Sequence, residues 1–163
     1  MADTTKEILD PASGGRMFYF DKKDPRVLFG DNRVFCGTLC DGRTFSVEPD
    51  EVIDFRNMPY KDGIFNLVIF DPPHLYRIGE HSWLNKKYGH LPKDGWKQCL
   101  KDGFEECWRV LAPGGTMIFK WNEHQISLSK IKDLFPDKPI MGTRVKTETV
   151  FVVFYKIRGG YDI

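Results

Sequence analysis

The 163-residue sequence lacks the features that mark most specialised protein classes. Its four cysteines make a poor disulfide framework, and their spacings miss the close Cys and His pairs of a zinc site. They are Cys36, Cys40, Cys99 and Cys107. No apolar run is long enough to cross a bilayer, and the first ten residues lack the basic-then-apolar pattern of a secretory signal. We therefore expect a cytoplasmic protein with reduced thiols, without a metal site and without a membrane partner.

An excess of charge of either sign is also absent. The chain has 24 Lys and Arg against 23 Asp and Glu, a net charge of +1, so no global field draws it onto nucleic acid or membrane. Any binding to nucleic acid must depend on a local patch. We find no internal repeat and no low-complexity linker, and the length and composition predict one domain over residues 1–163.

What the sequence does contain is a series of short β-branched and aromatic runs. Continuous apolar runs of this length are typical of strands buried on both faces, as in a parallel sheet covered by helices. The runs are Ile8-Leu9, Val27-Leu28-Phe29, Val52-Ile53, Asn66 to Phe70, Met117-Ile118-Phe119 and Thr149 to Tyr155. Their alternation with turns and helices predicts an α/β fold.

Two helices and a hairpin are predicted between these runs. Apolar residues recur at spacings of three and four from Trp96 to Leu111, and Pro113-Gly114-Gly115 is expected to stop this helix. A second helix is predicted from Ser127 to Phe135, with Ser127 as its cap. A hairpin with an Asp41-Gly42 turn, between Thr38 and Val47, is expected where a plain alternating fold would have a helix.

Four of the predicted strands end in an aspartate. These residues are Asp10, Asp31, Asp54 and Asp71. Ligands of an open parallel sheet bind at the carboxyl ends of its strands, so all four side chains would project from the binding edge. A single aspartate in a turn is common, but four in series, with Gly14-Gly15 after the first strand, indicate a ligand site.

The first half of the chain predicts a cofactor that contains adenosine. Gly14 and Gly15 allow a tight turn close to a ligand, although the complete three-glycine dinucleotide pattern is missing. Asp31 ends the second predicted strand, where a carboxylate suits the two hydroxyls of a ribose. This arrangement fits NAD and S-adenosylmethionine equally well.

The segment Asp71-Pro72-Pro73-His74 separates these two alternatives. Two successive prolines fix the backbone and hold the preceding carbonyls in a rigid, outward-facing arrangement. A carboxylate and a backbone carbonyl can each accept a hydrogen bond from one N–H of a planar amine. This interaction strengthens as positive charge builds on the nitrogen, so it stabilises the transition state of methyl transfer. A ring at the fourth position can stack on a target base.

With these residues, the chain resembles the class I S-adenosylmethionine-dependent methyltransferases. It is most similar to those that modify exocyclic amines of nucleic-acid bases and carry an Asp- or Asn-Pro-Pro-aromatic motif after the fourth strand. Ile8 to Gly14 resembles their first cofactor motif, and Trp108 to Gly115 resembles their crossing from helix to fifth strand. The resemblance covers nearly the whole chain. It implies a single-domain, Rossmann-like sheet, mostly parallel with an antiparallel C-terminal strand.

The resemblance also implies roles for individual residues. Those that would approach the methionine part of S-adenosylmethionine are Asp10, Pro11, Ser13 and Gly14. Asp31 would hold its ribose, Asp54 its adenine amino group and Phe55 its adenine face, and Asn32 would also bind the cofactor. The catalytic residues would be Asp71, Pro72, Pro73 and His74, with Asp71 also bordering the cofactor. No metal and no covalent nucleophile are needed, because the sulfonium already activates the methyl group.

Two positions depart from the family pattern. Arg16 stands where the first motif often has a last glycine, and His74 stands where Tyr, Phe or Trp is usual. A neutral imidazole can stack on a base, move a proton or have a purely structural role. These three readings remain open at this point.

Residues 75–97 form the one generous insertion, and we expect a substrate-recognition segment there. Basic and aromatic residues are interleaved in it: Arg77, Lys86, Lys87, Lys93 and Lys97 with Tyr76, Trp83, Tyr88 and Trp96. This mixture suits phosphate contacts and base stacking, and the alternative is an ordinary solvated loop. Extracting a base from a duplex costs about a few kcal/mol, so a segment this short would need a homodimer or a single-stranded or looped substrate.

Four polar and aromatic residues, Lys120 to Glu123, follow the fifth predicted strand. They would either line the substrate entrance or hold the next segment in place.

The combined prediction is an S-adenosylmethionine-dependent N-methyltransferase of DNA or RNA, with adenine N6 as the first acceptor. One alternative is methylation of a protein glutamine or a small-molecule amine. Another is a catalytically inactive, cofactor-binding partner of a second methyltransferase. An NAD-dependent enzyme is the weakest alternative, because its chemistry does not require the Asp-Pro-Pro motif.

Overall fold

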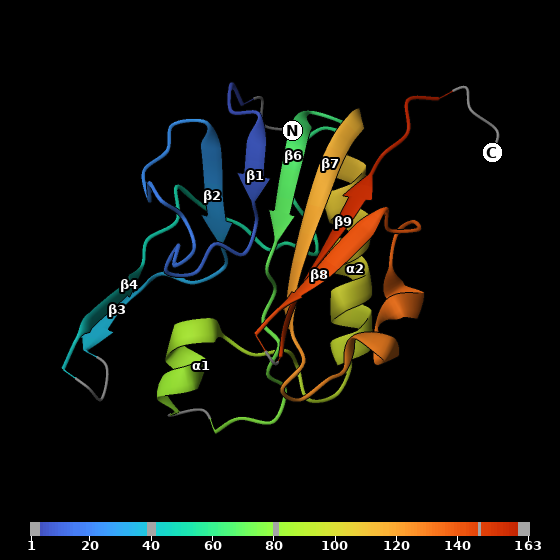
Figure 1. Ribbon diagram of the computed structural model, residues 1–163. Helices are drawn as coiled ribbons and strands as arrows, with labels where there is room; N and C mark the ends of the chain where they lie inside the picture. The colour runs from blue at the N-terminus through green and yellow to red at the C-terminus, as the bar shows by residue number, and fades with distance from the viewer. Residues whose placement is uncertain (1–3, 39–41, 80–81, 147, 160–163) are drawn as a thin grey trace.

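The structure is a computed structural model that describes residues 4–38, 42–79, 82–146 and 148–159. At its centre lies a seven-stranded sheet in the order β5-β2-β1-β6-β7-β9-β8 (Figure 1). The strands are β1 (Ile8–Asp10), β2 (Val27–Asp31), β5 (Glu51–Val52), β6 (Phe65–Phe70), β7 (Leu111–Asn122), β8 (Met141–Val145) and β9 (Thr149–Tyr155). The first five pair in parallel, whereas β9 is antiparallel to both β7 and β8. The predicted Rossmann-like α/β sheet, mostly parallel with an antiparallel C-terminal strand, is confirmed.

The strand order creates the crevice where a ligand can bind. The chain starts at β1, continues outward through β2 to β5, and then returns to place β6 on the other side of β1. Such a reversal of direction opens a gap at the carboxyl ends of the strands. The register sets Leu9 opposite both Leu28 and Val68. Asp10, Asp31 and Asp71 therefore come to the same edge of the sheet, as the strand-end pattern predicted.

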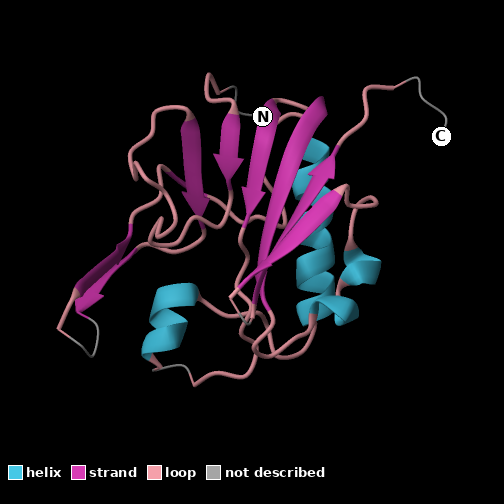
Figure 2. Ribbon diagram, in the orientation of Figure 1, coloured by secondary structure: helices cyan, strands magenta, loops and turns pink. Residues whose placement is uncertain are grey.

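The long helix α2 (Trp96–Val110) packs on one face of the sheet, as predicted, but its end differs (Figure 2). The helix changes directly into β7 at Leu111, whose N–H still bonds to the Cys107 carbonyl. Pro113-Gly114-Gly115 therefore lies within the strand, where the pairing with β6 shifts between Phe65 and Leu67. The Pro-Gly-Gly sequence forms an irregularity at the start of a strand and does not cap the helix.

The predicted helix from Ser127 to Phe135 is wrong. The segment instead forms two 3₁₀ turns, Leu128–Lys130 and Lys132–Leu134. The Ser127 hydroxyl makes no capping bond to the backbone, and the Leu128 N–H donates to the Glu123 carboxylate at 2.8 Å. The hydrogen bond from Leu128 to Glu123 fixes the first turn. Ser127, the expected helix cap, therefore does not determine the conformation of this segment.

Burial on both faces, expected for every strand, holds for β2 but not for β6, β7 and β9. Their side chains that face α2 are buried: Val68, Phe70, Met117, Phe119, Val152 and Phe154. Those on the opposite face are half-buried: Leu67, Ile69, Ile118, Phe151 and Val153. Among the described residues, α1 (Trp83–Tyr88) is the only other α-helix, and it lies below the carboxyl ends of the strands (Figure 1).

The predicted hairpin is present beside the sheet. β3 (Phe35–Thr38) pairs antiparallel with β4 (Thr44–Val47), in place of a helix between β2 and β5. Asp41 of the predicted turn is outside the described residues. The hairpin packs closely against the loop after β1. Gly15 of that loop leaves no room for a side chain, since an added Cβ would lie 2.4 Å from the Phe45 ring. No helix in the described ranges has both the length and the apolar character of a membrane span.

Candidate functional site

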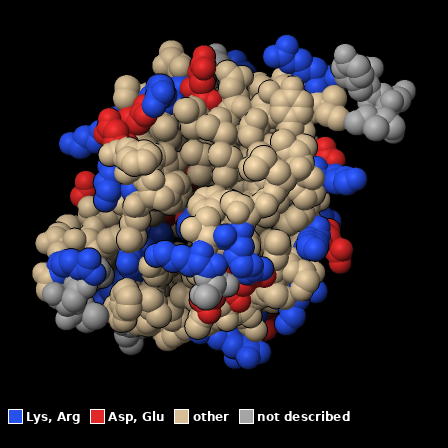
Figure 3. All heavy atoms as spheres, viewed as in Figure 1, with Lys and Arg blue, Asp and Glu red and all other residues tan. Residues whose placement is uncertain are grey.

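A cavity of about 800 Å³ opens at the carboxyl ends of β1, β2 and β6. It appears as the central hollow in Figure 3. Most of its wall is formed by residues 11–15, 17–18, 31–35, 71–74 and 85–92. Small-molecule sites commonly enclose about 300–1,000 Å³, so the cavity has the size of a ligand site.

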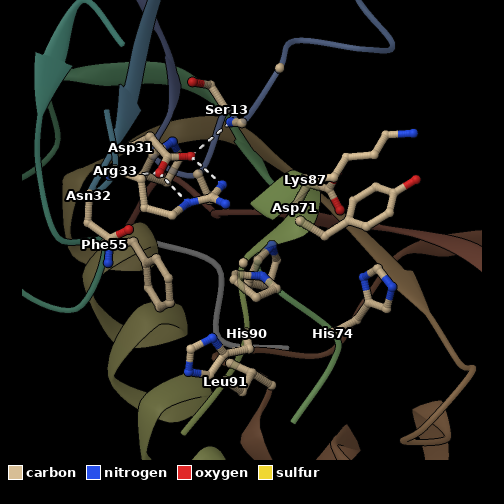
Figure 4. Close-up of a pocket in the computed structure, with 18 of the residues that line it drawn as sticks. Ser13, Asp31, Asn32, Arg33, Phe55, Asp71, His74, Lys87, His90 and Leu91 are labelled. Carbon is tan, nitrogen blue, oxygen red and sulfur yellow. Dashed lines mark hydrogen bonds and ion pairs between the residues drawn. The ribbon is translucent and has the colours of Figure 1, made fainter. Parts of the chain in front are cut away.

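Asp31 lies on one side of the cavity and has both carboxylate oxygens occupied (Figure 4). Oδ1 accepts hydrogen bonds from the backbone N–H and from Nε of Arg33, each at 3.0 Å. Oδ2 accepts from the Gly14 N–H at 2.9 Å and from Nη2 of Arg33 at 3.2 Å. Nη1 of Arg33 also donates to the Lys86 carbonyl at 3.4 Å. Arg33 thus connects the end of β2 to helix α1 across the cavity.

The loop after β1 contributes Pro11, Ser13 and Gly14 to the cavity wall. Gly14 has a φ of +49°, a conformation that favours glycine. The Ser13 hydroxyl is buried and has no hydrogen-bond partner among the described residues. An unpartnered buried hydroxyl is costly, so a ligand atom at this point would satisfy it.

Asp10 does not line the cavity. Its carboxylate is fully buried behind the wall, where it accepts hydrogen bonds from the Tyr19 hydroxyl at 2.8 Å and from the Ala12 N–H at 3.2 Å. Burial raises the pKa of Asp10 to about 7, although the bonds from Tyr19 and Ala12 oppose this shift. In this structure, Asp10 holds the loop that carries Ser13 and Gly14.

Asp54 is also outside the cavity wall, whereas Phe55 and Arg56 belong to it. The Asp54 carboxylate accepts hydrogen bonds from Nε of Arg56 at 2.9 Å and from Nη2 at 2.5 Å. The Phe55 ring is buried and packs edge-on against Phe70, which leaves it in position to form part of the wall. Asn32, next to Asp31, is exposed and lines the cavity.

Asp71 lies on the side of the cavity opposite Asp31 (Figure 4). Its Oδ2 atom is 2.6 Å from the ammonium group of Lys120, which comes from β7. Burial raises the pKa of Asp71, and the charge of Lys120 and its hydrogen bond lower it. Among the described residues, Lys120 is the one hydrogen-bond partner of this carboxylate, so Oδ1 remains available to a ligand.

The motif continues with Pro72, Pro73 and His74, all in the cavity wall. The His74 ring lies near Tyr88 and Trp121, with ring centroids 5.6 Å and 6.4 Å apart. Burial, followed by the charge of Lys120, lowers the pKa of His74 to about 4. The imidazole is therefore neutral near pH 7, which favours stacking over proton transfer.

The segment Lys120 to Glu123 was expected either to line the site or to hold the following segment, and its residues divide between these two roles. Lys120 lines the cavity and pairs with Asp71. Trp121 is fully buried, and its Nε1 donates to the Ile126 carbonyl at 2.8 Å. Glu123 accepts from the Leu128 N–H and pairs with Arg144. Only the first residue of the segment reaches the cavity, and the others hold the following turns.

Within the insertion at residues 75–97, the segment 85–92 lines the cavity. Leu91 is fully buried, and its N–H donates to the Leu75 carbonyl at 2.7 Å. Gln125 accepts from the N–H groups of Tyr76 and Arg77 at 2.9 and 3.0 Å, which fixes the start of the segment. Lys86 and Lys87 of α1 also line the cavity.

Arg16, which departs from the family pattern, keeps the backbone conformation that glycine favours. Its φ is +52°, which costs a residue with a side chain about 1 kcal/mol. The guanidinium donates to the carbonyls of Lys22 and Glu48, both at 2.6 Å, and pairs with Asp50 at 3.0 Å. It also lies over the Phe29 ring at 3.9 Å. These contacts offset the strain and make Arg16 a structural link.

The sequence interpretation missed several residues of this region, among them Phe18, Tyr19, Arg33 and Arg56. A repeated pattern would have found the two arginines. The sequence Asp-x-Arg occurs at Asp24, Asp31, Asp41 and Asp54. Asp41 is outside the described residues, and at the other three positions the arginine side chain returns to the aspartate two residues before it. Tyr19 gave no comparable signal, because its bond to Asp10 depends on the path of the loop.

No protein-family model and no curated protein matches the sequence. Among solved structures, the chain is similar to the PH0226 protein from Pyrococcus horikoshii OT3, with a TM-score of 0.59 and 17% sequence identity. The match covers 93% of this chain and 81% of that chain. At this level of identity the likeness concerns the fold, and it agrees with the Rossmann-like sheet.

Proposed function

We propose that the chain is an S-adenosylmethionine-dependent N-methyltransferase whose acceptor is an exocyclic amine of a nucleic-acid base, with adenine N6 first. The observation that carries this proposal is the position of Asp71. Its carboxylate opens on the same cavity as Gly14 and Asp31, and is followed by two prolines and His74 in the cavity wall. An amine held at Asp71 and an adenosine held at Asp31 would share one enclosed space.

The residues present fit the cofactor that the proposal requires. The buried Ser13 hydroxyl lacks a partner, and Gly14 presents backbone without a side chain at the same wall. Asp31 and Asn32 would hold the ribose, and Phe55 would contact the adenine face. Because Arg33 occupies both oxygens of Asp31, the ribose hydroxyls would replace some of its hydrogen bonds. When bound, the cofactor would supply a methyl group activated by its sulfonium.

The acceptor amine would bind at Asp71. An N–H of the amine donates to Oδ1 while Lys120 remains on Oδ2. The carboxylate interaction strengthens as the nitrogen becomes positively charged, so its contribution is largest in the transition state. Pro72 and Pro73 restrict the backbone that carries Asp71, which keeps the carboxylate aimed at the cavity.

His74 would contact the base and would not move a proton. With its pKa lowered to about 4, the ring is a poor proton acceptor near pH 7. A neutral ring retains its π face, and stacking of a base on an aromatic ring contributes roughly 1–3 kcal/mol. The neighbouring Tyr88 ring, 5.6 Å away by centroids, extends the same surface.

The direct test uses the purified chain with isotope-labelled S-adenosylmethionine and four acceptors. These are single-stranded DNA, single-stranded RNA, a glutamine peptide and free adenosine. We expect label in nucleic acid and, after digestion, N6-methyladenine by mass spectrometry. Label in the glutamine peptide alone would contradict the proposed acceptor. Cofactor binding without transfer to any acceptor would favour an inactive partner subunit.

A further inference from the structure

A second, smaller groove adjoins the cavity, and the proposed chemistry does not use it. It has a volume of about 350 Å³ and lies between the loop after β1 and strand β4 of the hairpin. We call it the side groove. Gly14, Gly15, Met17 and Lys87 line both the cavity and the side groove, so the two are continuous.

The side groove concentrates positive charge in a chain whose net charge is only +1. Five basic side chains line it, opposed by Glu48: Arg16, Lys22, Lys23, Arg43 and Lys87. Lys22, Lys23 and Arg43 are exposed. A local patch of this kind is what binding to a polyanion requires.

The walls of the side groove are held in place by the protein itself. Arg16 donates to the Lys22 carbonyl in one wall and to the Glu48 carbonyl in the other. Its charge is paired with Asp50, so Arg16 supports the groove and is not its ligand-binding group. The tight contact of Gly15 with the Phe45 ring joins the same two walls. The exposed side chains of Lys22 and Lys23 thus belong to a preformed frame.

Exposed apolar side chains lie beside this charge. Met17 is 57% exposed, Phe18 is 39% exposed and Phe20 is completely exposed. Met17 lines both spaces, and Phe18 lines the cavity. Exposed rings next to lysines are the combination that binds single-stranded nucleic acid, because bases stack on the rings and phosphates meet the charges. An acidic peptide would match the charges but would leave the rings exposed.

We propose that the side groove binds the sugar–phosphate backbone of a single-stranded nucleic acid, next to the nucleotide whose base enters the cavity. The identity of the strand as substrate rests on the proposed function, whereas the binding itself does not. A single strand fits because its bases are already unpaired, and extraction from a duplex would cost about a few kcal/mol.

The test is binding of fluorescent oligo-dT and oligo-U, measured by anisotropy without cofactor. These strands contain no adenine, so the result does not depend on methyl transfer. The groove variant is Lys22→Glu with Lys23→Glu. The matched control, Lys132→Glu with Lys138→Glu, makes the same change in net charge at exposed positions outside the side groove.

For the groove variant we expect the affinity for the oligonucleotides to fall about tenfold near 0.1 M salt. The slope of log binding constant against log salt concentration should become shallower by roughly 1.4, because two phosphate contacts are lost and each contributes about 0.7. The control should change both quantities much less, and the two variants should melt at similar temperatures. Equal weakening in the two variants would overturn the proposal, as would equally tight binding of a Glu-rich peptide. Comparison of dT with U distinguishes DNA from RNA.

The two proposals can fail separately. If oligonucleotide binding depends on the side groove but no acceptor is methylated, the side-groove proposal stands and the proposed function is refuted. If the chain methylates adenine but the groove variant binds oligonucleotides as tightly as the wild type, the side-groove proposal is refuted and the proposed function stands.

Discussion

Asp31 and Asp71 lie at the carboxyl ends of two parallel strands and face one cavity, yet they are held in different ways. The partner of Asp31 is Arg33, two residues along the chain, which bonds to both carboxylate oxygens. The partner of Asp71 is Lys120, 49 residues away, which bonds to one oxygen only. A ligand at Asp31 must therefore exchange partners, whereas a ligand at Asp71 can use a free oxygen. Under the proposed function, Asp31 would hold the cofactor by exchanging hydrogen bonds with Arg33, and Asp71 would bind the acceptor amine through its free oxygen.

The largest expected effect is at Asp71. Asp71→Ala should lower kcat by about a hundredfold or more, because it removes an acceptor used most strongly in the transition state. Cofactor affinity, measured by calorimetry, should change little. Turnover at the wild-type rate would contradict the assignment of chemistry to this carboxylate.

The next effect is expected at Asp31. Asp31→Ala should weaken cofactor binding by roughly tenfold or more, since hydrogen bonds to a charged group contribute about 1.5–3 kcal/mol. Asp54→Ala is the matched control, because that carboxylate bonds to Arg56 and lies outside the cavity wall. Equal losses in the two variants, measured by calorimetry, would mean that Asp54 moves into the site when the cofactor binds.

A smaller, pH-dependent effect is expected at Lys120. Lys120→Gln removes the charge that lowers the pKa of Asp71 and leaves the burial that raises it. The pKa of Asp71 then rises, so the carboxylate is protonated over a wider acidic range. The acidic limb of the kcat/KM profile should move to higher pH, with the greatest loss below neutral pH. An unchanged profile would show that the ion pair does not control Asp71.

The smallest effect concerns stability and tests a third strand-end carboxylate. Burial raises the pKa of Asp10 to about 7 in the folded chain, so the folded state binds a proton that the unfolded state releases near pH 4. Stability should therefore fall as pH rises from about 4 to about 7 and then level off. Thermal melts at pH 5 and pH 8 should differ by several degrees more in the wild type than in Asp10→Asn. If the melting temperatures of the wild type and Asp10→Asn depended equally on pH, Asp10 would not be the cause of the effect.

Local patterns in the sequence predicted the parts of the molecule that local interactions determine. The strand runs follow from continuous apolar residues and α2 follows from helical periodicity. The Asp-Gly turn predicted the hairpin, although β3 begins at Phe35, three residues before the predicted bounds, and β8 and α1 were not predicted. The carboxyl edge of the sheet followed from the strand-end aspartates. The side chains of Asp31 and Arg33 are also a local pair, and the repeated Asp-x-Arg pattern contained that information.

Long-range contacts determine the parts that the sequence did not predict. The Leu128 N–H bonds to Glu123, which replaces the helix start expected at Ser127. Asp10 turns to Tyr19 and away from the cavity, because the loop after β1 passes over it. Whether a strand is buried on one face or on both depends on which helices pack against the sheet. The apolar sequence of the strand alone does not determine this.

The link from Arg33 to both Asp31 and the Lys86 carbonyl has a kinetic consequence. A ligand that needs Asp31 meets a closed set of hydrogen bonds, so its association includes a rearrangement of Arg33 after the first encounter. The rate of such a process levels off at high ligand concentration, when the rearrangement becomes limiting. The measured affinity is then a difference between two sets of bonds, one made by the ligand and one made by the arginine.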